Sequence, residues 1–288
     1  MWYLPHTLLY FKMNKKMKKI ILNAFVLIAI VFLNSCTSND DAIIEQSSGA
    51  GKVSLYFDNG FSGDALLLGN SYTNGNGENL TINRFNYIIS NIVLYKTDGS
   101  SYVYPKVESY FIINEEKNLK TIELKNIPVG DYKSIKFGLG VDQQRYLEGE
   151  SNQQTFWDFA ASMDMVWTWS TGYRFINFEG SYTSSQTNGE IPFQVHQGSN
   201  SVTDNYQEIT LNLPTTLRVR PGDLPNIHLV SNANVILNGL HKIKLYDNLN
   251  QAGTATEIMG GENLIKIAEN SQEMFVVDHV HNGSGTQH

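Results

Sequence analysis

Short runs of alternating apolar and polar residues recur along most of this chain, and turn-forming residues separate them. Residues 52–58 (KVSLYFD) and 131–139 (DYKSIKFGL) alternate with period two, as expected for strands with one buried face. The other strand candidates are residues 82–96, 102–104, 110–114, 120–124, 190–196, 208–213, 216–220 and 226–230. Many short strands joined by tight turns are typical of sandwiches and barrels. The sequence therefore predicts an all-β, single-domain antiparallel β-sandwich.

Helical spacing is confined to two stretches. In residues 153–163 (QQTFWDFAASM), apolar side chains recur every three or four positions, which favours a short amphipathic helix. Residues 262–270 (ENLIKIAEN) follow a similar pattern. We therefore expect one or two short helices beside the sheets. Within residues 82–96, Ser90 and Asn91 separate two strand-like runs and predict a bulge or a bend.

The N-terminal region has the order of a secretory signal. Lysines at positions 15, 16, 18 and 19 precede a short apolar run, residues 20–33, and Asn34 and Ser35 then lead into Cys36. This arrangement resembles a bacterial lipobox. We expect residues 1–35 to be a leader and lipoprotein signal peptide and Cys36 to be the lipidation site. The localisation that follows is the cell envelope, as an outer-membrane lipoprotein facing either the periplasm or the surface.

The remaining boundaries follow from composition. Residues 36–50 are polar, include Asp40, Asp41 and Glu45, and predict a flexible acidic tether. Acidic residues directly behind a lipidated cysteine resemble the surface-export signals of Bacteroidetes lipoproteins. Residues 51–281 form the expected folded domain, and residues 282–288 are expected to be a disordered tail.

Several classes of function are disfavoured. Cys36 is the only cysteine, so the folded domain is expected to lack disulfides and cysteine metal ligands. The net charge of −7 and the lack of a basic patch disfavour nucleic-acid binding. No nucleophile elbow, HExxH run or phosphate-binding loop is present, so we do not expect an enzyme. A metal would have to be held by His, Met, Asp, Glu or the backbone.

Residues 163–180 (MDMVWTWSTGYRFINFEG) are the most unusual stretch of the chain. On an extended strand, Met165, Trp167 and Trp169 would face the same side. One interpretation is an aromatic core strand that ends in a turn at residues 170–172. The other is a soft-metal or redox site, because thioether and imidazole ligands suit Cu(I).

The histidines supply the second part of this hypothesis. His196, in the sequence FQVHQG, follows closely and is expected to lie in a strand that forms a hairpin with the tryptophan strand. His279 and His281 are two residues apart, so an extended segment would place both imidazoles on one face. A tail that carries two histidines could also close over a site assembled elsewhere. His228 and His241 stand alone and are expected to be structural or solvent-facing.

These residues together resemble the MbnP family of copper-binding proteins, which are associated with methanobactin operons. The resemblance rests on MVWTWSTGYRFINFEG followed by HQG, on RFNYIISNIVLY, on IPVGDYKSIKFGLGVD and on MFVVDHVHN. It spans residues 53–281 and is strongest for the Bacteroidetes lipoprotein branch. It implies a β-sandwich that binds copper, as Cu(I) or Cu(II), through histidines and a tryptophan-derived ligand. In relatives, a dihaem enzyme of the cytochrome c peroxidase/MauG type oxidises the tryptophan to kynurenine.

Carried over by position, the resemblance implies that Trp167 or Trp169 is the modified residue and that His196 is a copper ligand. A relative has a histidine two residues after its tryptophan, where this chain has Trp169. His279, His281 or Met165 would then complete the ligand set. The expected function is copper acquisition or handling by a lipid-anchored protein. The alternatives are a surface carbohydrate- or peptide-binding lipoprotein with an exposed Trp/Tyr face, and a structural lipoprotein without a small ligand.

Overall fold

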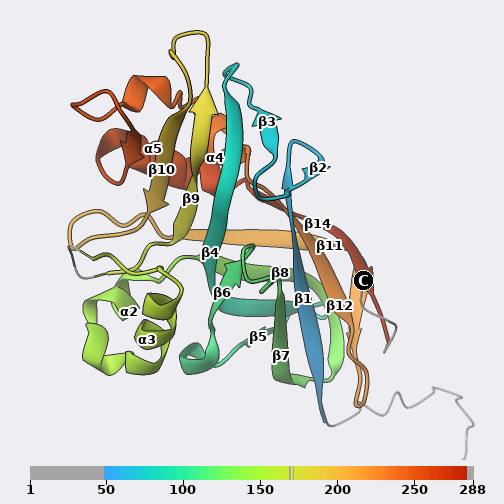
Figure 1. Cartoon of the computed structure of the whole chain (residues 1–288). Helices are drawn as coiled ribbons and strands as arrows, with labels where there is room; N and C mark the ends of the chain where they lie inside the picture. Colours follow the sequence, from blue (N-terminus) through green and yellow to red (C-terminus); the bar gives the residue numbers. More distant parts are fainter. Residues whose placement is uncertain (1–48, 169, 171, 284–288) are drawn as a thin grey trace, which may run out of the picture. The chain divides into compact units, whose positions relative to one another are not determined.

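Two β-sheets packed against each other form the body of the protein in the computed structural model, which describes residues 49–168, 170 and 172–283 (Figure 1). The predicted all-β sandwich is confirmed. The sheets are mostly antiparallel, and the parallel pairs are β1 with β12 and β10 with β13. Cys36 and the predicted signal and tether up to residue 48 lie outside the described residues, as do Trp169 and residues 284–288.

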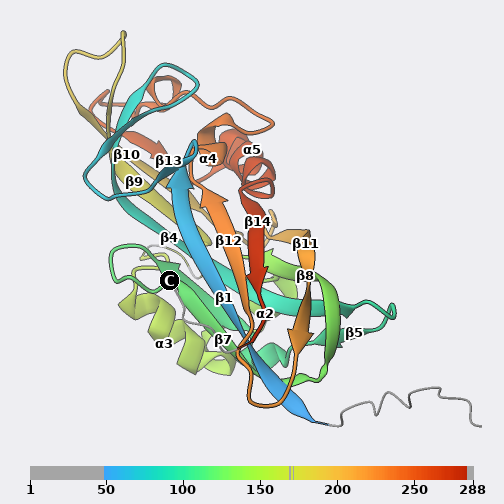
Figure 2. The same cartoon turned by 90° about the vertical axis from the view of Figure 1, so that its right-hand side faces the viewer.

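The smaller sheet has five strands and contains both ends of the described domain. Its order is β14 (Phe275–His281), β12 (Asn226–Asn232), β1 (Ala50–Phe61) and β2 (Asp64–Ala65), and β7 (Thr121–Pro128) also pairs with β1. Figure 2 shows β1, β12 and β14 side by side in this layer. The segment 274–281, predicted only as a tail, is therefore an edge strand.

The larger sheet has nine strands and is organised around one long strand, β4 (Asn79–Lys96). Its order is β11 (Gln207–Val219), β8 (Gly130–Leu139), β4, β9 (Ile176–Thr183), β10 (Ile191–Gln197) and β13 (Thr256–Ile258), while β3 (Ser71–Thr73), β5 (Ser101–Val103) and β6 (Tyr110–Asn114) also pair with β4. The β4–β8 register shifts between Ser90 and Val93, and Asn91 has a φ of 49°. The predicted interruption at Ser90 and Asn91 is thus a bulge that bends β4.

The helices are short and lie between strands. Those predicted at 153–163 and 262–270 are confirmed as α3 (Gln154–Ser162) and α5 (Gly261–Ser271). The sequence did not predict α2 (Gln143–Leu147), α4 (Val235–Asn238) or the 3-10 turns η1 (Lys106–Glu108), η2 (Glu150–Asn152) and η3 (Tyr246–Asn248). Among the described residues, no helix is both long and apolar enough to cross a membrane.

Aromatic rings from both sheets meet in the main core. Phe57 of β1 and Phe275 of β14 come from the smaller sheet, and Tyr87 of β4 and Phe137 of β8 come from the larger one. Their ring centroids lie 5.2–6.1 Å apart in edge-on arrangements. This interlocked group joins the two layers, since each ring contacts a ring of the opposite sheet.

One predicted strand does not form. The described residues between α3 and β9 make an isolated bridge, Val166 with Tyr173, and β9 begins only at Ile176. The amide of Arg174 donates to the carbonyl of Met165, and that of Trp167 donates to Gly172. The segment therefore folds back on itself at these residues, and it joins the neighbouring strands only from Phe175, whose backbone bonds to Gln197 of β10 and Ile88 of β4.

A half-buried carboxylate anchors α2 to the larger sheet. Asp142 caps α2 by accepting from the amide of Arg145. It also accepts hydrogen bonds of 2.7–2.9 Å from Lys106, Asn91 and Tyr110. Burial alone would raise the pKa of Asp142, but these hydrogen bonds outweigh it and lower the pKa to about 2.

Asp142→Asn is therefore expected to lower the free energy of unfolding by about 2 kcal/mol at pH 7. A carboxylate with a lowered folded-state pKa stabilises the fold above its unfolded pKa, near 3.8. That contribution is lost as the pH falls through about 2. Urea unfolding of both proteins between pH 7 and pH 3 should show the difference shrinking with pH. A constant difference would contradict this assignment.

Candidate metal centre

The β9–β10 hairpin places His196 on the face of the larger sheet that points away from the main core. His196 lies opposite Asn177 in the register, and Phe178 and Val195, their neighbours, pack into the core. Alternation along each strand turns His196, Asn177 and Glu179 to the other face. His196 is nevertheless only 2% exposed.

A carboxylate fixes the orientation of this imidazole. His196 Nε2 lies 2.6 Å from Glu179 Oε1, and Arg84 Nη1 lies 3.6 Å from the same oxygen. His196 Nδ1 is buried and has no hydrogen-bond partner among the described residues. A buried polar atom without a partner is costly, so the second ring nitrogen is a candidate ligand atom for a metal.

The electrostatics favour a neutral imidazole. Burial lowers the pKa of His196, and Arg174 acts in the same direction, although the hydrogen bond to Glu179 opposes them. Burial would raise the pKa of Glu179, but the hydrogen bond from His196 and the charges of Arg84 and Arg174 lower it overall. At neutral pH, the Nε2–H of His196 therefore donates to an ionised Glu179. This leaves a lone pair on Nδ1, as a metal-ligating histidine requires.

Further acceptor atoms lie beside His196 in the same row of the sheet. Asn86 pairs with Asn177, and Asn177 pairs with His196, across β4, β9 and β10. The amide nitrogens of Asn86 and Asn177 donate to Glu116 and to the carbonyl of Asp164. Their Oδ1 atoms are buried without a hydrogen-bond partner in the described part of the chain. Buried oxygen and nitrogen acceptors suit a cation.

Trp167 covers His196. The two rings have centroids 5.9 Å apart, and the guanidinium of Arg174 lies 5.3 Å from the indole. Trp167 is 7% exposed and lines a pocket of about 160 Å³ with Gly198, Asn205 and residues of α5. The pocket gives the indole an approach from solvent.

Gly198 explains why the histidine strand continues as H-x-G. A Cβ atom there would lie 2.5 Å from the carbonyl oxygen of Tyr173 and 3.0 Å from Cζ2 of Trp167. The indole therefore packs against a backbone that has no side chain.

Gly198→Ala is expected to displace Trp167 and to lower the free energy of unfolding by about 1–3 kcal/mol, because the tight contact includes backbone. Gly49→Ala is the matched control, since its Cβ would make only ordinary contacts at 3.5 Å and beyond. Urea unfolding followed by tryptophan fluorescence measures both. Equal stability of the two variants would refute the packing role of Gly198.

The structure separates the residues that the sequence grouped. Met165 is 0% exposed and packs in a second hydrophobic cluster with Ile88, Tyr173 and Phe175, so its thioether fills core space. His279 and His281 lie in β14 of the smaller sheet, whereas His196 lies in β10 of the larger one. The expectation that the tail closes over His196 is not realised, because β14 pairs with β12 instead.

The buried aromatic side chains also bear on the carbohydrate-binding alternative. Trp167, Tyr173, Phe175 and Phe178 are all buried. Among the described residues, this stretch therefore offers no exposed Trp/Tyr face on which a sugar could stack.

Sequence reasoning missed three participants in histidine clusters. The sequence pattern did not identify Glu179 or Arg84 as partners of His196. Glu179 is two residues from Asn177 on β9, and Arg84 is two residues from Asn86 on β4, so both lie on the same face of the sheet as His196. The alternation of side chains along these strands could have indicated their position. His228, expected to be structural or solvent-facing, lies against His279. That pairing depends on strand order, which the sequence does not give.

Fold and site together define a β-sandwich protein with a buried histidine–carboxylate pair beneath a tryptophan. The sequence profile of the MbnP family matches residues 50–259. The chain belongs to the MbnP family. A structure search matches MbnP from Methylosinus trichosporium with 12% identity and a TM-score of 0.45, over 81% of this chain and 98% of that chain. Comparison with curated proteins found no match.

Proposed function

We propose that this protein binds copper for acquisition or handling, with His196 as a ligand through Nδ1. The observation that carries the proposal is the buried Nδ1 lone pair, held in place by the 2.6 Å contact between Nε2 and Glu179. A carboxylate on the far nitrogen fixes the tautomer of a ligating histidine and increases its basicity. Family membership supports copper as the metal.

The imidazole of His196 suits copper in either oxidation state, Cu(I) or Cu(II). The site is buried beside an indole. Arg84 and Arg174 add positive charge, which Glu179 and Asp164 offset.

The second donor in this proposal comes from tryptophan. An unmodified indole is a poor ligand, because its nitrogen lone pair belongs to the aromatic system. Cleavage of the C2–C3 bond takes up two oxygen atoms, from dioxygen or hydrogen peroxide as the oxidant, and gives N-formylkynurenine. Hydrolysis then releases C2 as formate and leaves the aryl amine of kynurenine. Of Trp167 and Trp169, Trp167 is the one that the structure describes. It is the candidate for oxidation, since its ring contacts His196 and lines a pocket. The oxidising partner would be a dihaem enzyme of the cytochrome c peroxidase/MauG type.

The proposed location is the cell envelope. It rests on the signal-like residues 1–35 and on Cys36 as the lipidated residue. Replacing Cys36 with serine should release the protein from the membrane fraction. Membrane retention of that variant would refute the lipid anchor without affecting the copper proposal.

Titration with Cu(I) in competition with a chromophoric chelator tests the copper proposal. Uptake of nearly one copper ion per protein supports the proposal, provided that the bound copper prevents Zn²⁺ from binding at His196. Failure of the wild-type protein to take copper from any chelator refutes it.

Peptide mass analysis tests the tryptophan modification separately. The peptide covering residues 163–174 should show a carbon lost and an oxygen gained when the protein is produced with the dihaem enzyme, and no change without it. If the protein binds copper while this peptide is unmodified, the kynurenine ligand is refuted and copper is held by unmodified side chains.

A further inference from the structure

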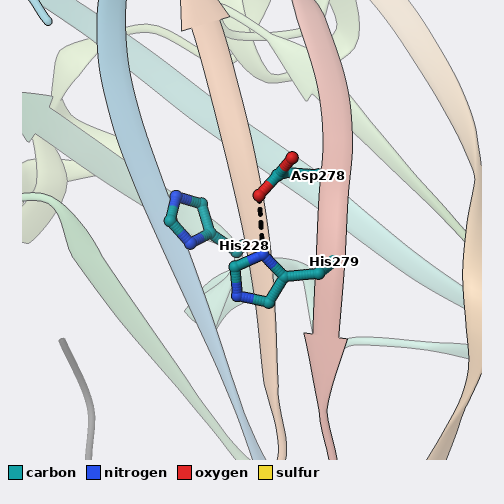
Figure 3. A group of neighbouring side chains, drawn as sticks. All are labelled: His228, Asp278 and His279. Carbon is teal, nitrogen blue, oxygen red and sulfur yellow. Dashed lines mark hydrogen bonds and ion pairs between the residues drawn. The ribbon is translucent and has the colours of Figure 1, made fainter.

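A second group of histidines lies on the outer face of the smaller sheet. His228 of β12 is directly opposite His279 of β14, and their ring centroids are 4.6 Å apart. Asp278 Oδ2 lies 2.6 Å from His279 Nδ1 (Figure 3). One ligand atom from each of His228, Asp278 and His279 lies within 4.8 Å of the others. We call these three residues and His281 the outer histidine cluster.

A bulge in β14 assembles the cluster. The register passes from Leu229–Val277 to His228–His279, so Asp278 is an extra residue. Val277 and Val280 pack against the main core. Regular alternation would place Asp278 and His279 on opposite faces, whereas the bulge turns both outward. His281, two residues on, stays on this face, and its ring centroid is 4.5 Å from that of His279.

Strand β1 adds a wall and a second carboxylate. The ring of Tyr56 meets His228 edge-on at 5.1 Å. Asp58 Oδ2 lies 3.4 Å from His228 Nε2. Tyr56 and Asp58 are two residues apart on the outward face of β1, whose other face is in the core. Imidazoles from two strands are thus flanked by a carboxylate on each side.

From this geometry we propose that the outer histidine cluster is a binding site for a divalent transition-metal ion, independent of the copper proposal for His196. His228 and His279 supply nitrogen ligands, Asp278 supplies an oxygen ligand or orients His279, and His281 completes the set. The charges of Asp58 and Asp278 balance a divalent ion. Imidazole and carboxylate donors without a sulfur ligand suit Zn²⁺, Cu²⁺ or Ni²⁺ better than Cu(I).

The cluster can contract around an ion with small side-chain rotations. Zinc bonds to imidazole nitrogen are about 2.0–2.1 Å long, which places tetrahedral ligand atoms roughly 3.4 Å apart. The present separations, within 4.8 Å, are slightly wider. His279 and His281 lie toward the end of an edge strand, where such adjustment disturbs little of the core.

Calorimetric titration of the metal-free full-length protein with Zn²⁺, purified with a histidine-free tag, tests the proposal. The wild type is expected to bind Zn²⁺ at micromolar affinity or better. His228→Ala and His279→Ala should each weaken binding at least about tenfold, and the double variant should lose the site. His241→Ala is the matched control, because His241 also contacts a carboxylate, Glu269 at 2.5 Å, but belongs to no candidate metal cluster in the described part of the chain.

Two further measurements separate the loss of Zn²⁺ binding from a loss of folding and from effects at the His196 site. His279→Asn preserves a polar side chain and should weaken Zn²⁺ binding with no change in thermal unfolding of the metal-free protein. Cu(I) uptake should be unchanged in the double variant, which separates this site from the His196 site. Equal Zn²⁺ affinity of the wild type and double variant, or no Zn²⁺ binding by the wild type, would overturn the proposal.

Discussion

His196→Ala is expected to weaken Cu(I) binding at least about 100-fold. Loss of a group that only hydrogen-bonds to a metal ligand typically lowers metal affinity about 10- to 100-fold, and loss of the ligand itself should lower it further. The variant removes the Nδ1 lone pair that is buried beneath Trp167. Competition titration with a Cu(I) chelator measures the change, and circular dichroism shows whether the sheet remains intact.

Two variants distinguish a ligand from a merely structural histidine. Glu179→Gln keeps an acceptor for Nε2–H but removes the charge, so a loss of only about tenfold is expected. His241→Ala removes a more exposed histidine that also contacts a carboxylate, Glu269, and should leave affinity unchanged. A wild-type affinity in His196→Ala would show that copper binds elsewhere.

Phe275→Ala is expected to lower the free energy of unfolding by about 3–5 kcal/mol, the cost of removing a large ring from a packed core. Phe275 contacts Phe57, Tyr87 and Phe137, with centroids 5.2–6.1 Å away. The cavity would lie where the two sheets join. Loosening β14 should also weaken Zn²⁺ binding at the outer histidine cluster.

Val276→Ala provides the control from the next position. Its side chain is 56% exposed on the opposite face of β14, so a change within about 0.5 kcal/mol is expected. Urea unfolding at equal protein concentration measures both variants. Similar destabilisation by the two substitutions would mean that β14 is held by its backbone pairing rather than by the aromatic core.

Most strands were predictable because their side chains alternate and their turns carry Gly, Asn, Asp or Pro. Residues 110–114 match β6, and the break at Ser90 and Asn91 is the bulge in β4. Residues 208–213 and 216–220 were expected as two strands, yet β11 runs through both with a register shift between Asn212 and Leu217. Alternation changes phase at a bulge, so a sequence pattern cannot tell a bulge from a turn.

The candidate site was predictable only in part. His196 and Trp167 do lie together, because the β9–β10 hairpin is local and the covering segment directly precedes it. The placement of His279 was not predictable, because two α-helices, a 3-10 turn and β13 lie between β12 and β14 in the chain. The bulge at Asp278 also reverses the facing of the residues after it. Long-range strand order and bulges are set by tertiary packing.

Copper content of the protein purified from its native host, measured for the wild type and His196→Ala in parallel, tests the central claim most directly. The account predicts near-stoichiometric copper in the wild type and its loss in the variant, whether or not Trp167 is modified. A wild-type protein that holds no copper even after reconstitution with Cu(I), or equal copper in both proteins, would contradict it.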